Sequence, residues 1–254
     1  MRSVSLAKIS EYCDRILDVS QIEDWPGAVN GLQVENRKGV SHIAAAVDGS
    51  LATVRMAAEK GADLLLVHHG LFWSPKQPWV GRNFELMEAL LSSGLAVYSA
   101  HLPLDVHPRY GNNVLLAKSL GLRGLKPFFF DHGRNLGVRA QSRLSRQALV
   151  DRLTVSLGGA IPVVLPGGDS VCRSIGVVTG GAGAELKIAA AEGVDTFITG
   201  EGPHWTYALA EDLGINVIYG GHYATETFGV KALAKHLATK FSIKWSFIDH
   251  PTGL

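Results

Sequence analysis

The residues best suited to chemistry in this sequence stand directly after three apolar runs. The runs ADLLLV, LAVYSA and INVIYGG each lead into histidine, and two of these histidines are followed four positions later by a carboxylate. Parallel strands bind ligands at their carboxyl ends, and imidazole with carboxylate suits divalent ions. The pattern therefore predicts a site for two metal ions with coordination positions left open. The predicted ligands are His68, His69, His101, Asp105, His222 and Glu226.

The pair His68-His69 is the sharpest local signal. Neighbouring side chains of a regular strand point to opposite faces, so the two rings cannot chelate one ion from within a strand. At a strand end, where the chain turns through Gly70, they can bind two ions about 3.5–4 Å apart. In the alternative, one ring binds metal and the other only caps the strand.

The other two motifs, HLPLDVHP and GHYATE, each pair a histidine with a carboxylate. Asp105 follows His101 around a proline-containing loop, and we expect its two oxygens to bridge the metals. His222 and Glu226 have the i, i+4 spacing of one helix face. A glutamate near a helix N-terminus is also favourable without metal, which is the alternative for that pair. His107 is either a further donor, a partner of a ligand or a surface group.

Glu201, in the segment TGEGPHW, is the candidate catalytic residue. It follows the apolar run DTFITG, and a carboxylate there can carry protons or contact a substrate. The alternative is a solvated charge at a strand end. Asp48 and Asn30 are interpreted as turn residues, with a place beside the site as the alternative.

A hidden repeat underlies these positions. Residues 42–70 align without a gap on residues 174–202, and the apolar pattern matches throughout. Each copy predicts a strand, a turn, a helix and a second strand. Matched pairs include Gly49 with Gly181, Asp63 with Asp195, and Gly61 with Gly193. The last pair follows the predicted helices, where a left-handed backbone is needed.

The predicted fold is α/β: a duplicated β-α-β core with mixed sheets flanked by helices, plus a small inserted α/β lobe. We expect residues 1–124 and 171–254 to form the duplicated metal-binding core. Residues 125–170 predict a β-α-β lobe between the halves. A helix at the N-terminus and another from Glu226 to Lys240 complete the expected elements.

Composition and cysteine usage predict a cytoplasmic protein without a nucleic-acid or membrane partner. The 254 residues include 24 basic and 23 acidic side chains, giving a net charge of +1 and no strong signal for nucleic acid. No apolar stretch approaches the roughly 20 residues that span a membrane. Cys13 and Cys172 lack CxxC spacing, which favours a reducing compartment.

Five motifs, in order, carry a family resemblance: NGLQVE, VHHGLFW, HLPLDVHP, TGE and GHYATE. Together they closely resemble the Nif3-like family of dinuclear metal proteins, whose members are commonly named type 2 homologues of GTP cyclohydrolase I. The resemblance implies a pair of α/β domains, assembly into a toroidal homohexamer, and the six metal ligands given above.

The expected activity is that of a metal-dependent hydrolase with a small, nucleotide-like substrate. Two divalent ions can lower the pKa of a bridging water from about 15.7 toward 7–9 and orient it for attack. Zinc, iron, manganese, cobalt and nickel all suit the donors. The alternative is a non-catalytic metal-binding protein, such as a metal chaperone, an insertase or a regulator.

Overall fold

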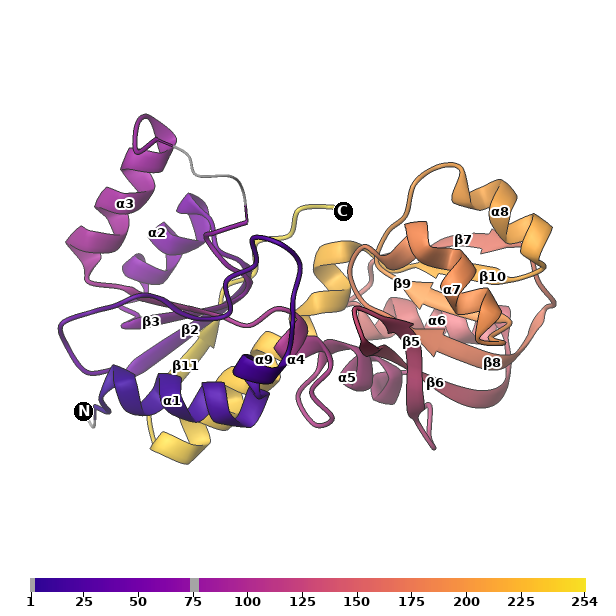
Figure 1. Cartoon of the computed structure of the whole chain (residues 1–254), viewed down its shortest axis with the longest axis horizontal. Helices are drawn as coiled ribbons and strands as arrows, with labels where there is room; N and C mark the ends of the chain where they lie inside the picture. Colours follow the sequence, from indigo (N-terminus) through magenta and orange to yellow (C-terminus); the bar gives the residue numbers. More distant parts are fainter. Residues whose placement is uncertain (1–2, 74–77) are drawn as a thin grey trace. The chain divides into compact units, whose positions relative to one another are not determined.

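The structure is a computed structural model that describes residues 3–73 and 78–254. The described chain divides into two compact units, and each is built around a β-sheet (Figure 1). Met1–Leu104 and Gly229–His250 form the first unit, and Asp105–Phe228 and Pro251–Leu254 the second. Both sheets are mixed and flanked by helices, which confirms the predicted α/β fold class. Within the described residues, no helix combines the length and hydrophobicity needed to cross a membrane.

The first unit is built on a five-stranded sheet of order β1-β4-β3-β2-β11. Its central strands β2, β3 and β4 are parallel, β11 adds in parallel to β2, and β1 adds antiparallel to β4. The strands are β1 (Gly31–Val34), β2 (His42–Asp48), β3 (Leu64–His69), β4 (Ala96–Ser99) and β11 (Lys244–Phe247). The helical segments are α1 (Leu6–Leu17), η1 (Val19–Gln21), α2 (Leu51–Glu59) and α3 (Arg82–Ser93).

The second unit is built on a six-stranded sheet of order β5-β6-β8-β9-β10-β7. Strands β8, β9 and β10 are parallel, and the other three pair antiparallel. The strands are β5 (Lys126–Asp131), β6 (Arg134–Ser145), β7 (Val163–Pro166), β8 (Val171–Val177), β9 (Thr196–Thr199) and β10 (Asn216–Tyr219). The helical segments are α5 (Asn112–Ser119), α6 (Arg146–Ser156), η2 (Ala182–Glu185), α7 (Leu186–Ala191) and α8 (Thr206–Leu213). Helices α4 (Leu102–Asp105) and α9 (His222–Phe241) include the residues where the division falls.

The unit boundaries differ from those expected from the sequence. Strands β5, β6 and β7, from the segment predicted to be a separate lobe, belong to the same sheet as β8, β9 and β10. Helix α6 of that segment buries Leu149 and Leu153 in the core of the same sheet. The division falls between Leu104 and Asp105. Strand pairing over long sequence separations decides this membership, and local patterns do not encode it.

The predicted repeat is present in the pairing of the strands. Ile43 of β2 lies opposite Leu64 of β3, and Ile175 of β8 lies opposite Thr196 of β9, the same pairing shifted by 132 positions. The helix that joins each pair is followed by a glycine in the left-handed region. Gly61 and Gly193 have φ values of 66° and 78°, which confirms their prediction as residues after a helix end.

In each unit, an aspartate just before the second strand of the repeat (β3 or β9) bonds the backbone of the first strand (β2 or β8) in the same way. Its carboxylate accepts hydrogen bonds from two consecutive backbone N–H groups at the start of the first repeat strand. The donors are Ser41 and His42 for Asp63, at 2.8 and 3.2 Å, and Arg173 and Ser174 for Asp195, at 2.8 and 3.1 Å. We call this arrangement the aspartate clamp. It lies at the strand ends opposite to the predicted metal ligands.

Candidate metal centre

Three predicted ligands meet in the first unit. His68 and His69 end β3, and His101 follows β4, its parallel neighbour. One ligand nitrogen of each ring lies within 4.8 Å of the others. His68 is fully buried, and the other two are partly buried. The adjacent strand ends therefore bring the three rings together.

Each of these rings is held through its Nδ1 atom. The acceptors are the Ala100 carbonyl for His68, the Asp48 carboxylate for His69 and the Asp24 carboxylate for His101, each at 2.8 Å. A neutral imidazole whose Nδ1 donates a hydrogen carries its lone pair on Nε2. Histidines that bind metals are oriented by such an acceptor in nearly every protein. All three rings are thus set to offer Nε2 to a metal ion.

Asp24 is a partner of the site that sequence reasoning missed. Its Oδ2 atom accepts hydrogen bonds from the Asn30 side chain at 2.7 Å and from the Leu102 backbone at 3.1 Å. Asn30 in turn accepts a hydrogen bond from the His101 backbone at 2.7 Å. Burial acts to raise the pKa of Asp24, but the hydrogen bonds and charge from His101, with the bonds from Asn30 and Trp25, hold it below its usual value. The carboxylate stays ionised beside the ring.

Trp73 forms an aromatic wall beside two of the rings. Its indole meets His101 edge to face, with ring centroids 4.6 Å apart, and meets His69 similarly at 5.7 Å. A large apolar ring next to the histidines displaces water and lowers the local dielectric, which strengthens any electrostatic interaction there. The motif VHHGLFW therefore supplies both donors and their apolar cover.

The remaining three predicted ligands belong to the second unit. Helix α9 begins at His222 and presents Glu226 one turn later, with His222 Nε2 3.2 Å from Glu226 Oε2. Asp105 and Glu226 each place a carboxylate oxygen within 4.8 Å of the other. Both carboxylates are buried. The i, i+4 spacing accounts for the closeness of His222 and Glu226 on one helix. The fold then brings the Asp105 carboxylate close to that of Glu226.

Glu201 contacts His222 through the same kind of bond. Its Oε1 atom lies 2.8 Å from His222 Nδ1, so it holds this ring as Asp24 and Asp48 hold theirs. Burial acts to lower the pKa of His222, but the hydrogen bonds and charges of Glu226 and then Glu201 raise it to about 9. The two carboxylates favour a positive charge at this ring, whether a proton or a divalent ion.

A close approach of backbones brings Glu201 to His222. A Cβ atom on Gly200 would lie 2.6 Å from the Gly180 carbonyl oxygen and 2.7 Å from His222 Cα. The Gly200 and Glu201 N–H groups both donate to that carbonyl, at 2.8 and 3.1 Å. The motif TGE therefore needs glycine at its centre, because a side chain there would separate β9 from the start of α9.

Two asparagines of the segment GNN hold Asp105. Asn112 Nδ2 donates to Asp105 Oδ1 at 2.8 Å, and Thr179 Oγ1 contacts the same oxygen at 3.5 Å. The Asn113 side chain donates a hydrogen bond to the Leu136 carbonyl at 2.7 Å and accepts one from the Thr179 backbone N–H at 2.7 Å. These bonds to Oδ1 fix the orientation of the Asp105 carboxylate.

His107 differs from the four candidate ligand histidines. Its Nδ1 atom accepts hydrogen bonds from the backbone of Arg109 and Tyr110, at 3.1 and 3.0 Å. In the neutral ring the hydrogen then lies on Nε2, the opposite arrangement to that of a ring that offers Nε2 to a metal. Its ring also stacks on Tyr110, with centroids 4.8 Å apart.

The fold and these donor groups together define a class of protein. It is an α/β protein of two units whose histidines and carboxylates can hold metal ions. The family model for Duf34/NIF3 (NGG1p interacting factor 3) matches residues 4–252. The chain therefore belongs to the Duf34/NIF3 family.

Relatives and solved structures agree with this assignment. A protein from Deinococcus radiodurans named "GTP cyclohydrolase 1 type 2 homolog" is 42% identical over 89% of this chain and 87% of its own length. A Pyrococcus abyssi protein of the same name is 41% identical over 97% and 98%. The crystal structure of TTHA1606 from Thermus thermophilus superposes with a TM-score of 0.91, at 40% identity, over 99% of this chain and 100% of that one.

Proposed function

We propose that this protein is a dinuclear metal-dependent hydrolase of a small, nucleotide-like molecule. One observation carries the proposal: all four candidate ligand histidines use Nδ1 to contact a carbonyl or a carboxylate, so each can offer Nε2. The proposed ligands are His68, His69, His101, Asp105, His222 and Glu226.

The donor set fits divalent ions. Imidazole nitrogens and carboxylate oxygens suit zinc, iron, manganese, cobalt and nickel. Purely structural zinc sites use closed, cysteine-rich shells, whereas these donor groups contain no cysteine. Bound divalent ions would supply Lewis acidity and a water of lowered pKa, the chemistry of metal-dependent hydrolysis.

The chain's own residues orient this chemistry. Asp24, Asp48 and Glu201 fix the rings of His101, His69 and His222, and Asn112 fixes Asp105. Glu201 is also half exposed, so its carboxylate can exchange protons with solvent. We propose that it carries the proton released in hydrolysis, in addition to holding His222.

The names of the relatives support the nucleotide-like substrate. Proteins about 40% identical to this chain are named as homologues of GTP cyclohydrolase 1 type 2. A hydrolase that opens a purine ring or cleaves a phosphoester would use the same metals and the same proton carrier. A metal chaperone, an insertase or a regulator would use the ligands without turnover.

Metal stoichiometry tests the proposal. Protein purified without chelator or nickel affinity resin should contain close to two metals per chain by elemental analysis. Asp105→Asn should lose the second metal and all activity while its circular dichroism spectrum stays native. Asp212→Asn, which changes an exposed side chain of α8, is the control and should keep both metals.

The outcomes separate the candidates. Hydrolysis of nucleotides or phosphoesters by metal-loaded protein, absent in Asp105→Asn, supports the enzyme. Two tightly held metals without turnover on that panel favour the non-catalytic alternative. Retention of both metals in Asp105→Asn would overturn the bridging role. We also propose a homohexamer, and a monomeric mass by light scattering would overturn it.

A further inference from the structure

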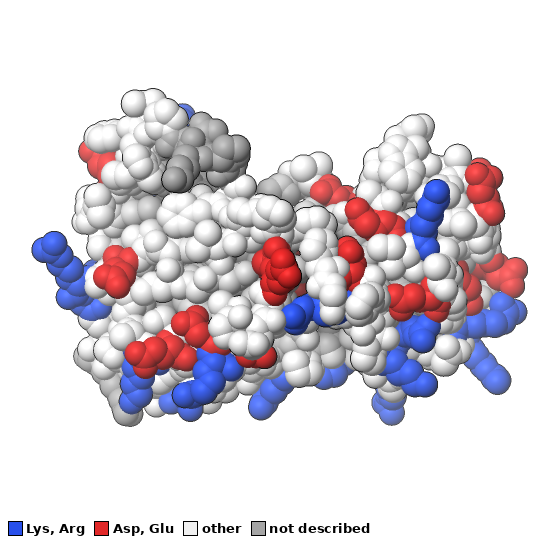
Figure 2. All heavy atoms as spheres, viewed as in Figure 1, with Lys and Arg blue, Asp and Glu red and all other residues white. Residues whose placement is uncertain are grey.

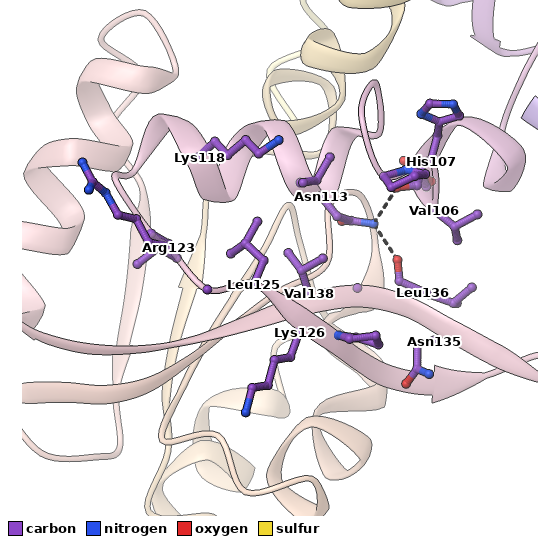
Figure 3. Close-up of a pocket in the computed structure, with 17 residues that line it drawn as sticks. Val106, His107, Asn113, Lys118, Arg123, Leu125, Lys126, Asn135, Leu136 and Val138 are labelled. Atoms are coloured by element: carbon purple, nitrogen blue, oxygen red, sulfur yellow. Dashed lines mark hydrogen bonds between the residues drawn. The ribbon is translucent and has the colours of Figure 1, made fainter. Parts of the chain in front are cut away.

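A pocket of about 610 Å³ lies within the second unit, and Asp105 is one of its lining residues. Helix α5 forms one wall, and strands β5 and β6 form the other (Figure 3). Pockets of 300–1,000 Å³ hold small organic molecules. The space is therefore large enough for a molecule with a ring and several substituents.

The floor of the pocket is hydrocarbon. Leu125 and Val138 lie between the helix and the strands in Figure 3, and Leu122 and Leu136 line the same space. Leu122 and Leu136 are buried, and the other two are partly buried. Such a surface favours the apolar face of a planar ring over a sugar or an inorganic ion.

Three cationic residues surround this floor. Lys118, Arg123 and Lys126 are exposed, and among the described residues none of them forms an ion pair. In Figure 3 their side chains extend away from one another, and their flexible stems can fold onto an anion at the cost of conformational entropy. Asp105 is the one acidic side chain in the described lining.

On the face shown in Figure 2, basic and acidic side chains intermingle with wide uncharged areas between them. In the pocket, by contrast, three cations accompany a single carboxylate, which we have proposed as a metal ligand. Three cations against one carboxylate leave the pocket lining with a net positive charge, which attracts anions.

We propose that this pocket binds an organic phosphate with a planar ring, as in a nucleoside monophosphate. The ring lies on Leu125 and Val138, and the phosphate lies against Lys118 and Arg123. In Figure 3 Arg123 lies on the far side of the pocket from Asn113, whose neighbour Asn112 holds Asp105, and Lys118 lies between the two along the helix. The identification of this ligand with the substrate rests on the proposed function.

Calorimetric titration of the full-length protein tests the pocket directly. The protein is first stripped of metal with a chelator, so that metal–phosphate contacts contribute nothing. The probes are AMP and GMP, with adenosine, glucose 6-phosphate and inorganic phosphate for comparison. The nucleotides should bind most tightly, because only they combine a planar aromatic ring with a phosphate, and added salt should weaken their binding.

Charge reversal identifies the site. Lys118→Glu combined with Arg123→Glu should weaken nucleotide binding by at least about tenfold. Arg143→Glu combined with Lys187→Glu makes the same change of net charge on exposed residues of β6 and α7, and should leave binding within about twofold. Native circular dichroism spectra in both variants exclude misfolding.

Three results would overturn the proposal. Inorganic phosphate that binds as tightly as the nucleotides would mean an adventitious ion only. Equal affinity in the two charge-reversal variants would place the ligand elsewhere, and no nucleotide binding at all would leave the pocket without this ligand. Nucleotide binding by the stripped protein, together with no metal uptake and no turnover when metal is supplied again, would overturn the hydrolase while the pocket stands.

Discussion

Asp24 and His101 are separated by 77 positions, yet Asp24 Oδ1 lies 2.8 Å from His101 Nδ1. The same carboxylate also accepts hydrogen bonds from Asn30 and from the backbone of Leu102. One loop residue therefore fixes the ring of a proposed ligand and the start of the helix that follows it. The orientation of His101 depends on a residue outside the ligand motif.

We expect Asp24→Asn to weaken metal binding by about 10–100-fold, because the amide is a weaker acceptor and can present its NH₂ group to Nδ1. Competition with a fluorescent chelator measures the affinity. Glu23→Gln removes a charge from the neighbouring exposed position and is the control. Equal affinity of the two variants would show that Asp24 does not orient a metal ligand.

The aspartate clamp should contribute stability that depends on pH. Burial acts to raise the pKa of Asp63, but hydrogen bonds from Ser41 and His42 and the charge of Lys38 outweigh it and lower the pKa. The stabilisation is therefore present above the unfolded value of about 3.9 and is lost as the pH falls through the lower folded value.

Asp63→Asn should accordingly reduce the free energy of unfolding by about 1–3 kcal/mol at pH 7. Urea titrations between pH 7 and pH 3 should show the difference from wild type shrinking as the pH falls. Glu59→Gln, at the end of α2, is the control and should show a small difference at every pH. A difference for Asp63→Asn that grows toward low pH would contradict the clamp.

Gly200→Ala should damage both the fold and the proposed centre. The new Cβ would press on the backbone of Gly180 and His222, neither of which can rotate away. We expect a loss of about 1–3 kcal/mol in stability, as for an overpacked core, together with weaker metal binding.

Gly193→Ala is the control that distinguishes backbone strain from a steric clash of the new Cβ atom. Its left-handed backbone strains any side chain, but a Cβ there meets no atom within 4 Å. It should cost about 1 kcal/mol and leave metal content unchanged. Thermal unfolding and elemental analysis of both variants decide the matter. Unaltered metal content in Gly200→Ala would argue against the need for close contact between β9 and α9.

Asn112→Leu keeps the branched shape of a fully buried side chain and removes its hydrogen bond to Asp105. The carboxylate oxygen left behind should cost about 1–3 kcal/mol in the metal-free protein. We expect metal affinity to fall as well, since the ligand loses its orientation. Saturation with metal should recover part of the lost thermal stability. A variant that matches wild type in both measurements would show that Asp105 is held by other contacts.

The sequence predicted the parts of the site that depend on local spacing. Strand ends, the i, i+4 pair of His222 and Glu226, and the glycines after two helices all follow from patterns within a few residues. The repeat predicted the shared strand register as well. These features lie on single elements or on neighbouring parallel strands.

The partners of the ligands were harder to predict. Asp24 lies in a loop without periodicity, and its role follows only from the need of His101 Nδ1 for an acceptor. Asp48 was interpreted as a turn residue, although it contacts His69. The second unit's sheet also includes strands from the segment expected to form a separate lobe, because β6 and β7 pair with β8 and β10, which are distant in sequence.

The aspartate clamp has a consequence for how such a protein can change over time. Asp63 and Asp195 act at the strand ends opposite to the proposed ligands, and both halves of the repeat retain them. The ligand ends differ, since His69 in one half corresponds to Glu201 in the other. The residues that stabilise the fold and those proposed to carry out the chemistry therefore lie at opposite ends of the same strands. Donors can be exchanged for another metal or reaction while the scaffold that carries them is preserved.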